Sequence, residues 1–150
     1  MAMYERILVA TDGSELSELA VHSAIDLALL MQAELIAVKV VHHYPASYFE
    51  GSLLLSQVEV DRLTEQANAE AQRVVDEVKA TADARGVKNA RAIVMQAELV
   101  SEAIIEAARV HHCDLIVMAS HGRRGIKRLL MGSETLHVLT HSHTPVLVLR

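Results

Sequence analysis

The chain has 150 residues, a formal net charge of −5 and one cysteine; 51% of its residues are hydrophobic and only 3% are aromatic. These values exclude an internal disulfide framework and argue against a general nucleic-acid binder, which would carry a basic face. The length suits one domain, residues 1–150, and a core of Val, Ile, Leu, Ala and Met favours helices packed on a parallel sheet over a β-sandwich.

The first predicted strand is the apolar run Arg6–Thr11, which ends at the turn Asp12-Gly13-Ser14. The run is too short to cross a membrane, and the residues before it do not form a signal peptide. We therefore expect a cytoplasmic protein without a membrane partner. Ser14 is a suitable N-cap for a helix that continues to Met31. The apolar side chains of this helix recur on one face, at Leu16, Ala20, Ala24, Leu27 and Met31.

A second strand is expected over Glu34–Val41, and a loop around Pro45 follows it. This loop carries three of the four aromatic residues of the chain, at Tyr44, Tyr48 and Phe49. Such a concentration at one strand end indicates either a lid or interface, or a loop packed on its own side chains.

The longest helical pattern runs from Gln57 to Arg85, and Gly86 ends it as the glycine at the C′ position of the helix. Its frequent alanines favour a helix lying on a sheet over a coiled coil. One apolar stripe follows the helical repeat, at Val60, Leu63, Ala67, Ala71, Val74, Val78 and Ala82.

Strands and helices continue to alternate to the end of the chain. The predicted elements are the strand Asn89–Gln96, the helix Val100–His112, the strand Asp114–Ala119, the helix Ser133–Ser142 and the strand Thr144–Leu149. This order predicts an α/β fold with a single five-stranded parallel sheet, right-handed crossovers and helices on both faces. Ligands of such sheets bind beyond the carboxyl ends of the strands. Cys113 precedes the fourth strand and is expected to be a small core residue.

The segment after the fourth strand has the composition of a phosphate site. Glycines and hydroxyls follow Ala119, and Gly132-Ser133 opens the last predicted helix. Glycine lets backbone N–H groups approach an anion, and a helix N-terminus adds a favourable dipole. If the first and fourth strands are neighbours, the turn at Asp12 joins this segment in one cleft. Four basic residues lie between Gly122 and Gly132. They belong either to a solvated loop or to a positive cluster that attracts an anionic ligand: Arg123, Arg124, Lys127 and Arg128.

The chain resembles the universal stress protein family over nearly its full length. The family's nucleotide loop, Gly-x2-Gly-x9-Gly-(Ser/Thr), corresponds here to Ala119, Gly122 and Gly132-Ser133, and the opening Ile7–Ser14 and the ending Thr144–Leu149 are also similar. The resemblance implies the strand order 3-2-1-4-5 of the adenine nucleotide alpha hydrolase-like fold. It also implies a homodimer paired through Val146–Leu149, an apolar edge candidate.

Family members with this loop bind ATP, so the resemblance implies bound ATP, or AMP or ADP, with Mg²⁺ carried by the nucleotide. Gly122, Gly132 and Ser133 would hold the phosphates, and Val40 would offer backbone groups to the adenine. Asp12 would lie near the ribose or a phosphate-bound metal. The full set of expected nucleotide-binding residues is Ala10, Thr11, Asp12, Val40, Met118, Ala119, His121, Gly122, Arg123, Gly132, Ser133, Glu134 and Thr135.

Two residues depart from what the family's loop favours. Ala119 replaces the first glycine, and its methyl group would penalise a positive φ and weaken binding by on the order of a kcal/mol. Glu134 lies just inside the last helix, where a carboxylate stabilises the helix end but would repel a nearby phosphate.

Other chemistry receives less support from the sequence. His137, His141 and His143 are spaced for zinc, but no cysteine or obvious carboxylate accompanies them, so we predict no metal site and no catalytic residue. A Walker-type Gly-Lys-Ser/Thr motif is absent, so any ATP hydrolysis should be slow. The alternatives to an ATP-binding regulatory dimer are a stress-protein dimer without nucleotide, acting through protein contacts, and a weak ATP-hydrolysing or adenylyl-transferring enzyme. Asp12-Gly13-Ser14 is only faintly similar to the loop of the adenylyl-transferring enzymes.

Overall fold

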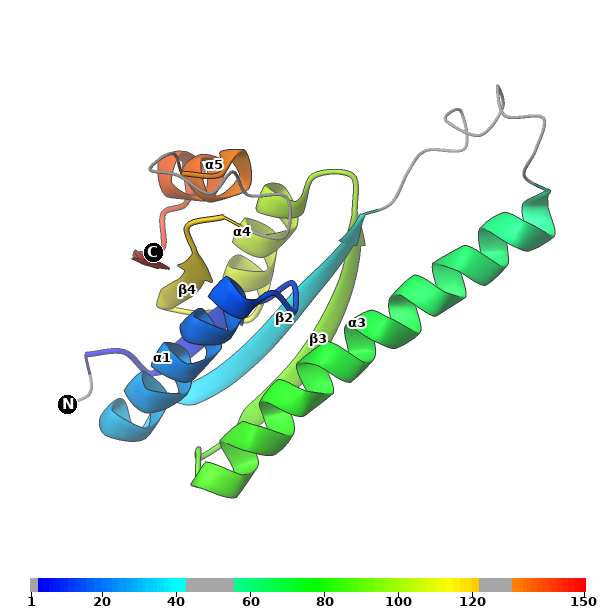
Figure 1. The fold of residues 1–150 in the computed structure, drawn as a ribbon. Coiled ribbons are helices and arrows are strands. Elements are labelled where there is room, and N and C mark those ends of the chain that lie inside the picture. Colours follow the sequence, from blue (N-terminus) through cyan, green and yellow to red (C-terminus); the bar gives the residue numbers. More distant parts are fainter. Residues whose placement is uncertain (1–2, 43–55, 122–130) are drawn as a thin grey trace.

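The computed structural model describes residues 3–42, 56–121 and 131–150. In chain order the elements are β1 (Arg6–Ala10), α1 (Glu15–Met31), β2 (Glu34–His42), α3 (Gln57–Arg85), β3 (Ala90–Ala97), α4 (Val100–Val110), β4 (Leu115–Ala119), α5 (Ser133–His141) and β5 (Val146–Leu149). The strands form one parallel sheet in the order β3-β2-β1-β4-β5 (Figure 1). This topology confirms the predicted fold class and strand order.

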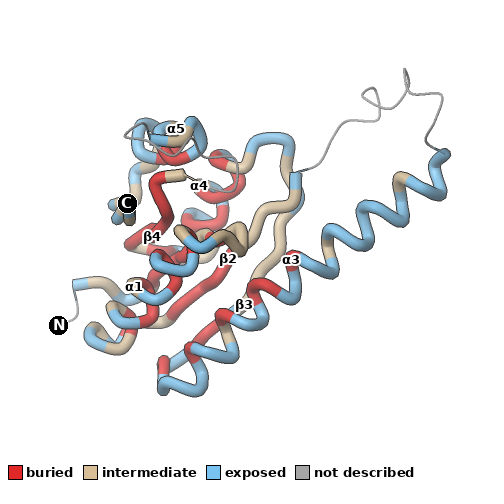
Figure 2. Tube along the Cα trace, viewed as in Figure 1, coloured by how far each residue is buried: buried red, intermediate tan, exposed pale blue. Residues whose placement is uncertain are grey.

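Helices cover both faces of the sheet, as predicted. Leu35 and Ala37 of β2 pack with α1 and α3 on one face, and Ile36 and Val38 pack with α4 and α5 on the other. The alternation follows from the two-residue repeat of a strand. Because β1 and β4 lie in the middle of the sheet, both are covered on both faces, and β4 is buried along its whole length (Figure 2).

The packing of α1 differs from the predicted face. Ser14 is the N-cap, as predicted, and its Oγ accepts a hydrogen bond from the Ser17 N–H at 3.2 Å. Of the predicted stripe, Ala20 and Ala24 are buried, whereas the larger members are only half-buried: Leu16, Leu27 and Met31. Leu27 and Met31 pack at the margin of the core, and the buried face also includes Val21 and Ile25, which the predicted stripe omitted. The buried positions are Ser17, Ala20, Val21, Ala24, Ile25 and Ala28.

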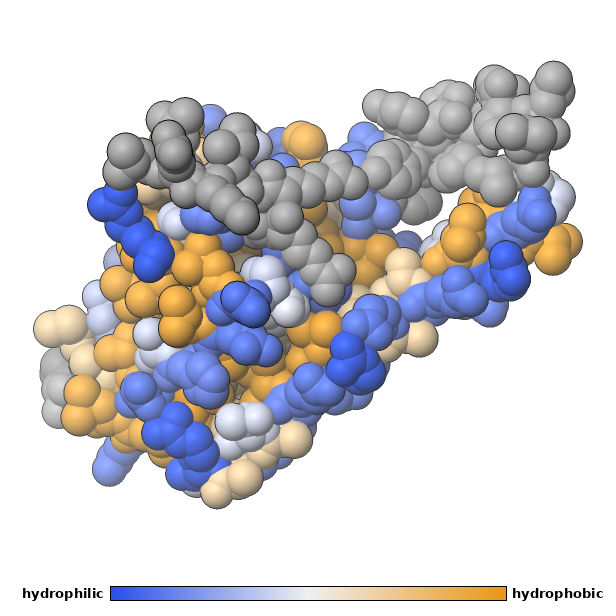
Figure 3. Space-filling view, viewed as in Figure 1, coloured by the Kyte–Doolittle hydropathy of each residue, from blue (hydrophilic) through white to orange (hydrophobic). Residues whose placement is uncertain are grey.

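Only the second half of α3 lies on the sheet. Its buried residues begin at Ala71 and end at Ala82, whereas Leu63 and Ala67 of the predicted stripe are exposed, so the prediction was wrong for the first half. The amino-terminal half extends past the end of the sheet (Figure 1), and apolar atoms remain at its surface (Figure 3). Gly86 ends the helix with φ 93°, as predicted.

The start of β4 is tied to the amino-terminal end of the sheet. The Asp114 carboxylate accepts hydrogen bonds from the N–H groups of Glu5 and Arg6, at 2.8 and 3.1 Å. Cys113 beside it is a buried free thiol, and burial raises its pKa to about 11, which favours the inert thiol over the reactive thiolate. Within the ranges described, the helices are too short or too polar to cross a membrane.

The close contact of α1 with the sheet can be tested at Ala24, which has no exposed surface. Ala24→Leu should lower the free energy of unfolding by about 1–3 kcal/mol, because three extra carbons cannot be placed without displacing the helix. Leu30→Ala on the same helix is the control, since Leu30 is 78% exposed; its effect should stay within about 0.5 kcal/mol. Urea denaturation measures both, and equal effects would contradict this packing.

Candidate functional site

The carboxyl ends of β1 and β4 lie side by side at one edge of the sheet. Val9 is level with Val117 across the two strands, and Ala10 is level with Val38 of β2. β2 continues to His42, so Val40 lies beyond the end of β1. The strand order reverses between β1 and β4, and this is the position where open α/β sheets form a ligand crevice.

The turn after β1 is held by its own side chains. The Thr11 N–H donates to the Val38 carbonyl at 3.0 Å, while Thr11 Oγ1 lies 3.1 Å from Ser17 Oγ and accepts from the Gly13 N–H at 3.2 Å. Gly13 has φ 82°, a conformation that other residues rarely adopt. The hydroxyl of Thr11 therefore supports the start of α1, although its predicted role was nucleotide contact.

Asp12 reaches the edge of the sheet as expected, but its carboxylate is engaged. Its Oδ1 accepts a hydrogen bond from the Ser14 N–H at 2.9 Å, which closes the turn. The sequence analysis missed Lys39 of β2, whose Nζ donates to the Asp12 carbonyl at 3.3 Å. The signal was present in the sequence, since Lys39 is the one charged residue within the apolar run Leu35–Val41.

The end of β4 is joined to the start of α5 by two short hydrogen bonds. The Gly132 N–H donates to the Ser120 carbonyl at 2.7 Å, and Thr135 Oγ1 donates to the Ala119 carbonyl at 2.9 Å. Thr135 is only 2% exposed, so its hydroxyl hydrogen binds the protein's own backbone. His121 follows β4, and its Nδ1 lies 3.1 Å from Ser120 Oγ.

Gly132 occupies a place where a side chain does not fit comfortably. A Cβ atom there would lie 3.2 Å from His121 Cβ and 3.3 Å from the Ser120 carbonyl oxygen. Gly132 is also the N-cap of α5, and no side chain in the described ranges caps this helix. Ser133 in the first turn is exposed, so the positive end of the helix dipole meets solvent beside the end of β4.

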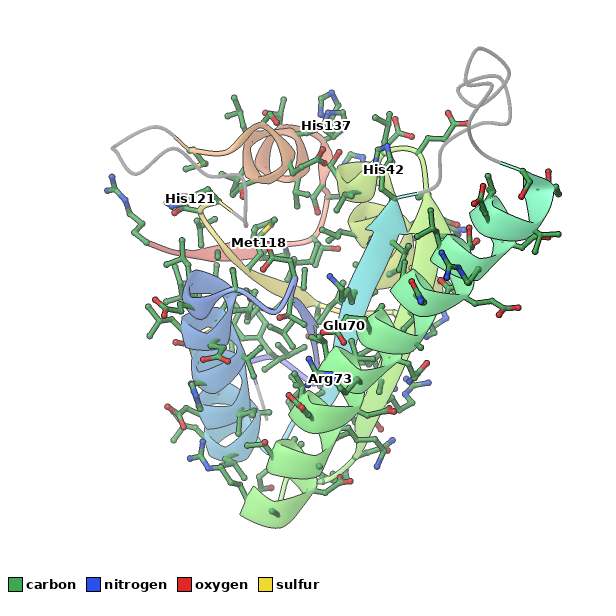
Figure 4. All side chains as sticks on the ribbon, turned by 45° about the vertical axis from the view of Figure 1, so that its right-hand side comes forward. His42, Glu70, Arg73, Met118, His121 and His137 are labelled. Carbon is green, nitrogen blue, oxygen red and sulfur yellow. The ribbon has the colours of Figure 1, made fainter. Side chains whose placement is uncertain are left out.

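An apolar layer lies below this edge. Met118 is buried and packs with the half-buried residues Ala10 and Val40 in the cluster under α4 and α5. Figure 4 shows Met118 and His121 at the carboxyl end of β4, on the side of the molecule where α5 lies. Three of the four apolar residues expected to contact the nucleotide therefore share one face, and they come from three adjacent strands.

The expectation of backbone strain at Ala119 is wrong. Ala119 is the buried last residue of β4, and the described non-glycine residues with positive φ are Gln32 and His112. Extended backbone accepts alanine without penalty, so the glycine-to-alanine argument does not apply here. Glu134 lies in the first turn of α5, as expected, but its Oε2 accepts from the Ser101 N–H of α4 at 2.7 Å.

Some predicted residues lie outside the described ranges. These are Gly122 and Arg123 of the expected site, the cations Arg124, Lys127 and Arg128, and the aromatic residues Tyr44, Tyr48 and Phe49. In the described ranges, no group of three or more His, Cys, Asp or Glu side chains is arranged to hold a metal. His137 and His141 instead stack with ring centroids 4.1 Å apart, and His141 Nδ1 donates to the His137 carbonyl at 3.0 Å.

A parallel α/β sheet with a helix N-terminus at its strand-reversal point defines the class of nucleotide-binding α/β folds. The sequence profile of the Universal stress protein family matches residues 3–150. The chain belongs to this family, as the sequence analysis predicted.

Relatives and solved structures agree with this assignment. Universal stress protein MJ0531 of Methanocaldococcus jannaschii is 34% identical over 148 residues, which cover 99% of this chain and 83% of the relative. The structure of universal stress protein UspA from Lactobacillus plantarum is 27% identical, covers 100% of both chains and has a TM-score of 0.80. A universal stress protein solved in complex with cAMP is 25% identical, with a TM-score of 0.71 and coverage of 100% of this chain and 98% of that one.

The link between β4 and α5 can be tested at Thr135. Thr135→Val keeps the shape but removes the hydroxyl that binds the Ala119 carbonyl, which should cost about 1–3 kcal/mol because a buried acceptor loses its partner. Thr140→Val is the control, because Thr140 donates to the Leu136 carbonyl on the exposed side of the same helix. Chemical denaturation compares the two; a loss at Thr140 as large as that at Thr135 would contradict a special role for this bond.

Proposed function

We propose that this chain binds ATP, or the related AMP or ADP, at the edge formed by β1, β4 and the start of α5. The observation that carries the proposal is the first turn of α5, which no side chain of the described residues caps and which Gly132 holds against the Ser120 carbonyl. Backbone N–H groups and the helix dipole at this place favour a phosphate. The relative in complex with cAMP supports an adenine nucleotide as the ligand.

The arrangement of the described residues supports one orientation of the nucleotide. The phosphates would lie at Gly132 and Ser133, near His121, and the family resemblance adds Gly122 and Arg123 to this group. The ribose would lie between Asp12 and the end of β4 at Met118 and Ala119. The adenine would contact the apolar layer of Ala10 and Val40, and the backbone of Val40 would offer its polar groups. Mg²⁺ would arrive with the nucleotide, and the Asp12 carboxylate would lie near it.

A regulatory role with slow or no hydrolysis fits this site better than an efficient enzyme. Phosphoryl transfer needs a positioned nucleophile and a full set of charges around the phosphate. Asp12 already accepts the Ser14 N–H, and the Thr135 hydroxyl already donates to the Ala119 carbonyl. These groups organise the backbone, so we propose that the bound nucleotide controls protein contacts of a cytoplasmic module.

Titration calorimetry with ATP and Mg²⁺ tests nucleotide binding directly. Gly132→Val should abolish binding, because the added side chain would push the start of α5 away from Ser120 and His121. Met131→Val, a change at the exposed neighbouring residue, is the control and should keep the affinity. Circular dichroism should show both variants folded, since Gly132 lies outside the core clusters.

Each alternative function has its own outcome in this experiment. Absence of binding to the unmodified protein would favour a dimer that acts through protein contacts alone. Release of ADP or pyrophosphate at several turnovers per minute would favour an enzyme. Equal affinity of the unmodified protein and Gly132→Val would refute the proposed phosphate position.

We also propose a homodimer paired through β5. This strand has one neighbour in the sheet, β4, and lies at an edge. The carbonyl groups of Pro145 and Leu149 accept hydrogen bonds from backbone N–H groups of Ile116 and Ser120. The backbone N–H and C=O groups of Val146 and Val148 therefore point away from β4, toward the open side of the strand. Leu147 on β5 and Leu136 and Leu139 on α5 are exposed apolar residues near this edge. Unpaired backbone beside apolar side chains favours pairing with a second copy.

The dimer proposal can be tested at Val148. Val148→Pro removes an N–H that faces away from β4 and should convert the dimer into monomers, because the lost donor belongs to the edge. Val148→Thr keeps the branched side chain and the N–H, and should remain a dimer. Sedimentation velocity measures the mass of both, and a dimeric Val148→Pro variant would place the interface elsewhere.

A further inference from the structure

The start of α4 lacks the usual capping side chain. Its N-cap is Leu99, whose side chain has no group that could accept a hydrogen bond from the first turn, and Leu is among the poorest residues at this position. The Ser101 N–H in that turn is nevertheless bonded, since Glu134 Oε2 of α5 accepts from it at 2.7 Å. A residue 33 positions away in the sequence therefore performs the capping.

This contact also determines where the charge of Glu134 lies. The carboxylate is directed to the amino end of α4, where the helix dipole stabilises a negative charge. It is one residue beyond Ser133 on α5, the residue expected to hold a phosphate. The bond to α4 thus uses a charge that would otherwise act against an anion at the start of α5.

The same contact joins the first turns of α4 and α5 beside the crevice. α5 is tied to β4 through Gly132 and Thr135, and it is tied to α4 through Glu134. Ser101 is buried, with 3% of its surface exposed, so the amino end of α4 is itself a fixed point. The first turn of α5 is therefore held on two sides.

We infer that Glu134 is a positioning residue: it caps α4 from α5 and so holds the first turn of α5 in the orientation that receives the phosphates, without contacting the nucleotide. This inference rests on the proposed nucleotide function. It replaces the expectation that Glu134 belongs to the nucleotide-contacting set and mainly repels the ligand.

Two substitutions at Glu134 separate positioning from repulsion. Glu134→Gln keeps an oxygen that can accept from Ser101 but removes the charge; Glu134→Ala removes both. Positioning predicts that Glu134→Ala lowers the ATP affinity about five- to tenfold, the usual scale for a lost helix cap, while Glu134→Gln binds ATP as well as the unmodified protein or better. Repulsion alone predicts that both variants bind more tightly to the same extent, which would overturn the inference.

Glu102→Ala is the matched control. Glu102 is an acidic residue in the first turn of α4, and its replacement leaves the contact between Glu134 and Ser101 intact. Titration calorimetry should give it the affinity of the unmodified protein. A loss as large as that of Glu134→Ala would mean that any carboxylate near this turn has the same effect, and would overturn the inference.

Hydrogen exchange of the Ser101 amide, measured without nucleotide, tests the cap independently of binding. The amide should exchange at least fivefold faster in Glu134→Ala and should stay protected in Glu134→Gln. Unchanged exchange in Glu134→Ala would overturn the inference. If the unmodified protein does not bind ATP, the proposed function fails, and this exchange measurement still decides whether Glu134 caps α4.

Discussion

The parallel pairing of β1 with β4 is the constraint on which the site depends. Both strands are covered by helices on both faces, so a slip in their register would exchange the side chains of the two buried clusters and disrupt the packing of both. Because the strands are parallel, the turn after β1 and the segment after β4 must leave the sheet at the same edge. The crevice is thus a consequence of the central strand pair, and the loops add the chemistry.

Backbone groups provide most of the organisation at this edge. The carbonyls of Val38, Ala119 and Ser120 each accept a hydrogen bond from a residue of the proposed site. The backbone contacts at Val38 and Ser120 depend on the path of the chain and tolerate changes of side chain, apart from the close approach at Gly132. The contact at Ala119 needs the Thr135 hydroxyl. The buried hydroxyl groups of Thr11 and Thr135 also form hydrogen bonds with backbone groups at this edge.

The sequence predicted the elements of the fold well, since their boundaries depend on local signals such as the caps at Ser14 and Gly86. Strand order came from the family resemblance, because local patterns do not specify which strands pair. The buried face of α1 was predicted in part, since Ala20 and Ala24 are buried but the stripe omitted Val21 and Ile25. The partners of Lys39 and Glu134 were not predictable, because each contact joins distant parts of the chain.

Because only part of α3 packs on the sheet, the two halves of this helix should differ in how well they tolerate amino-acid substitutions. Its carboxyl-terminal half shares the core with β2 and β3, whereas its first turns depend on the capping box of Ser56 and Glu59 and on solvent-exposed side-chain contacts such as that of Gln57 with Asp61. Exposed pairs add little to stability, and cooperativity along a helix decays away from its anchored end. Sequence drift should therefore accumulate fastest in the first turns of α3, while the half beneath the sheet stays under selection for its small volume.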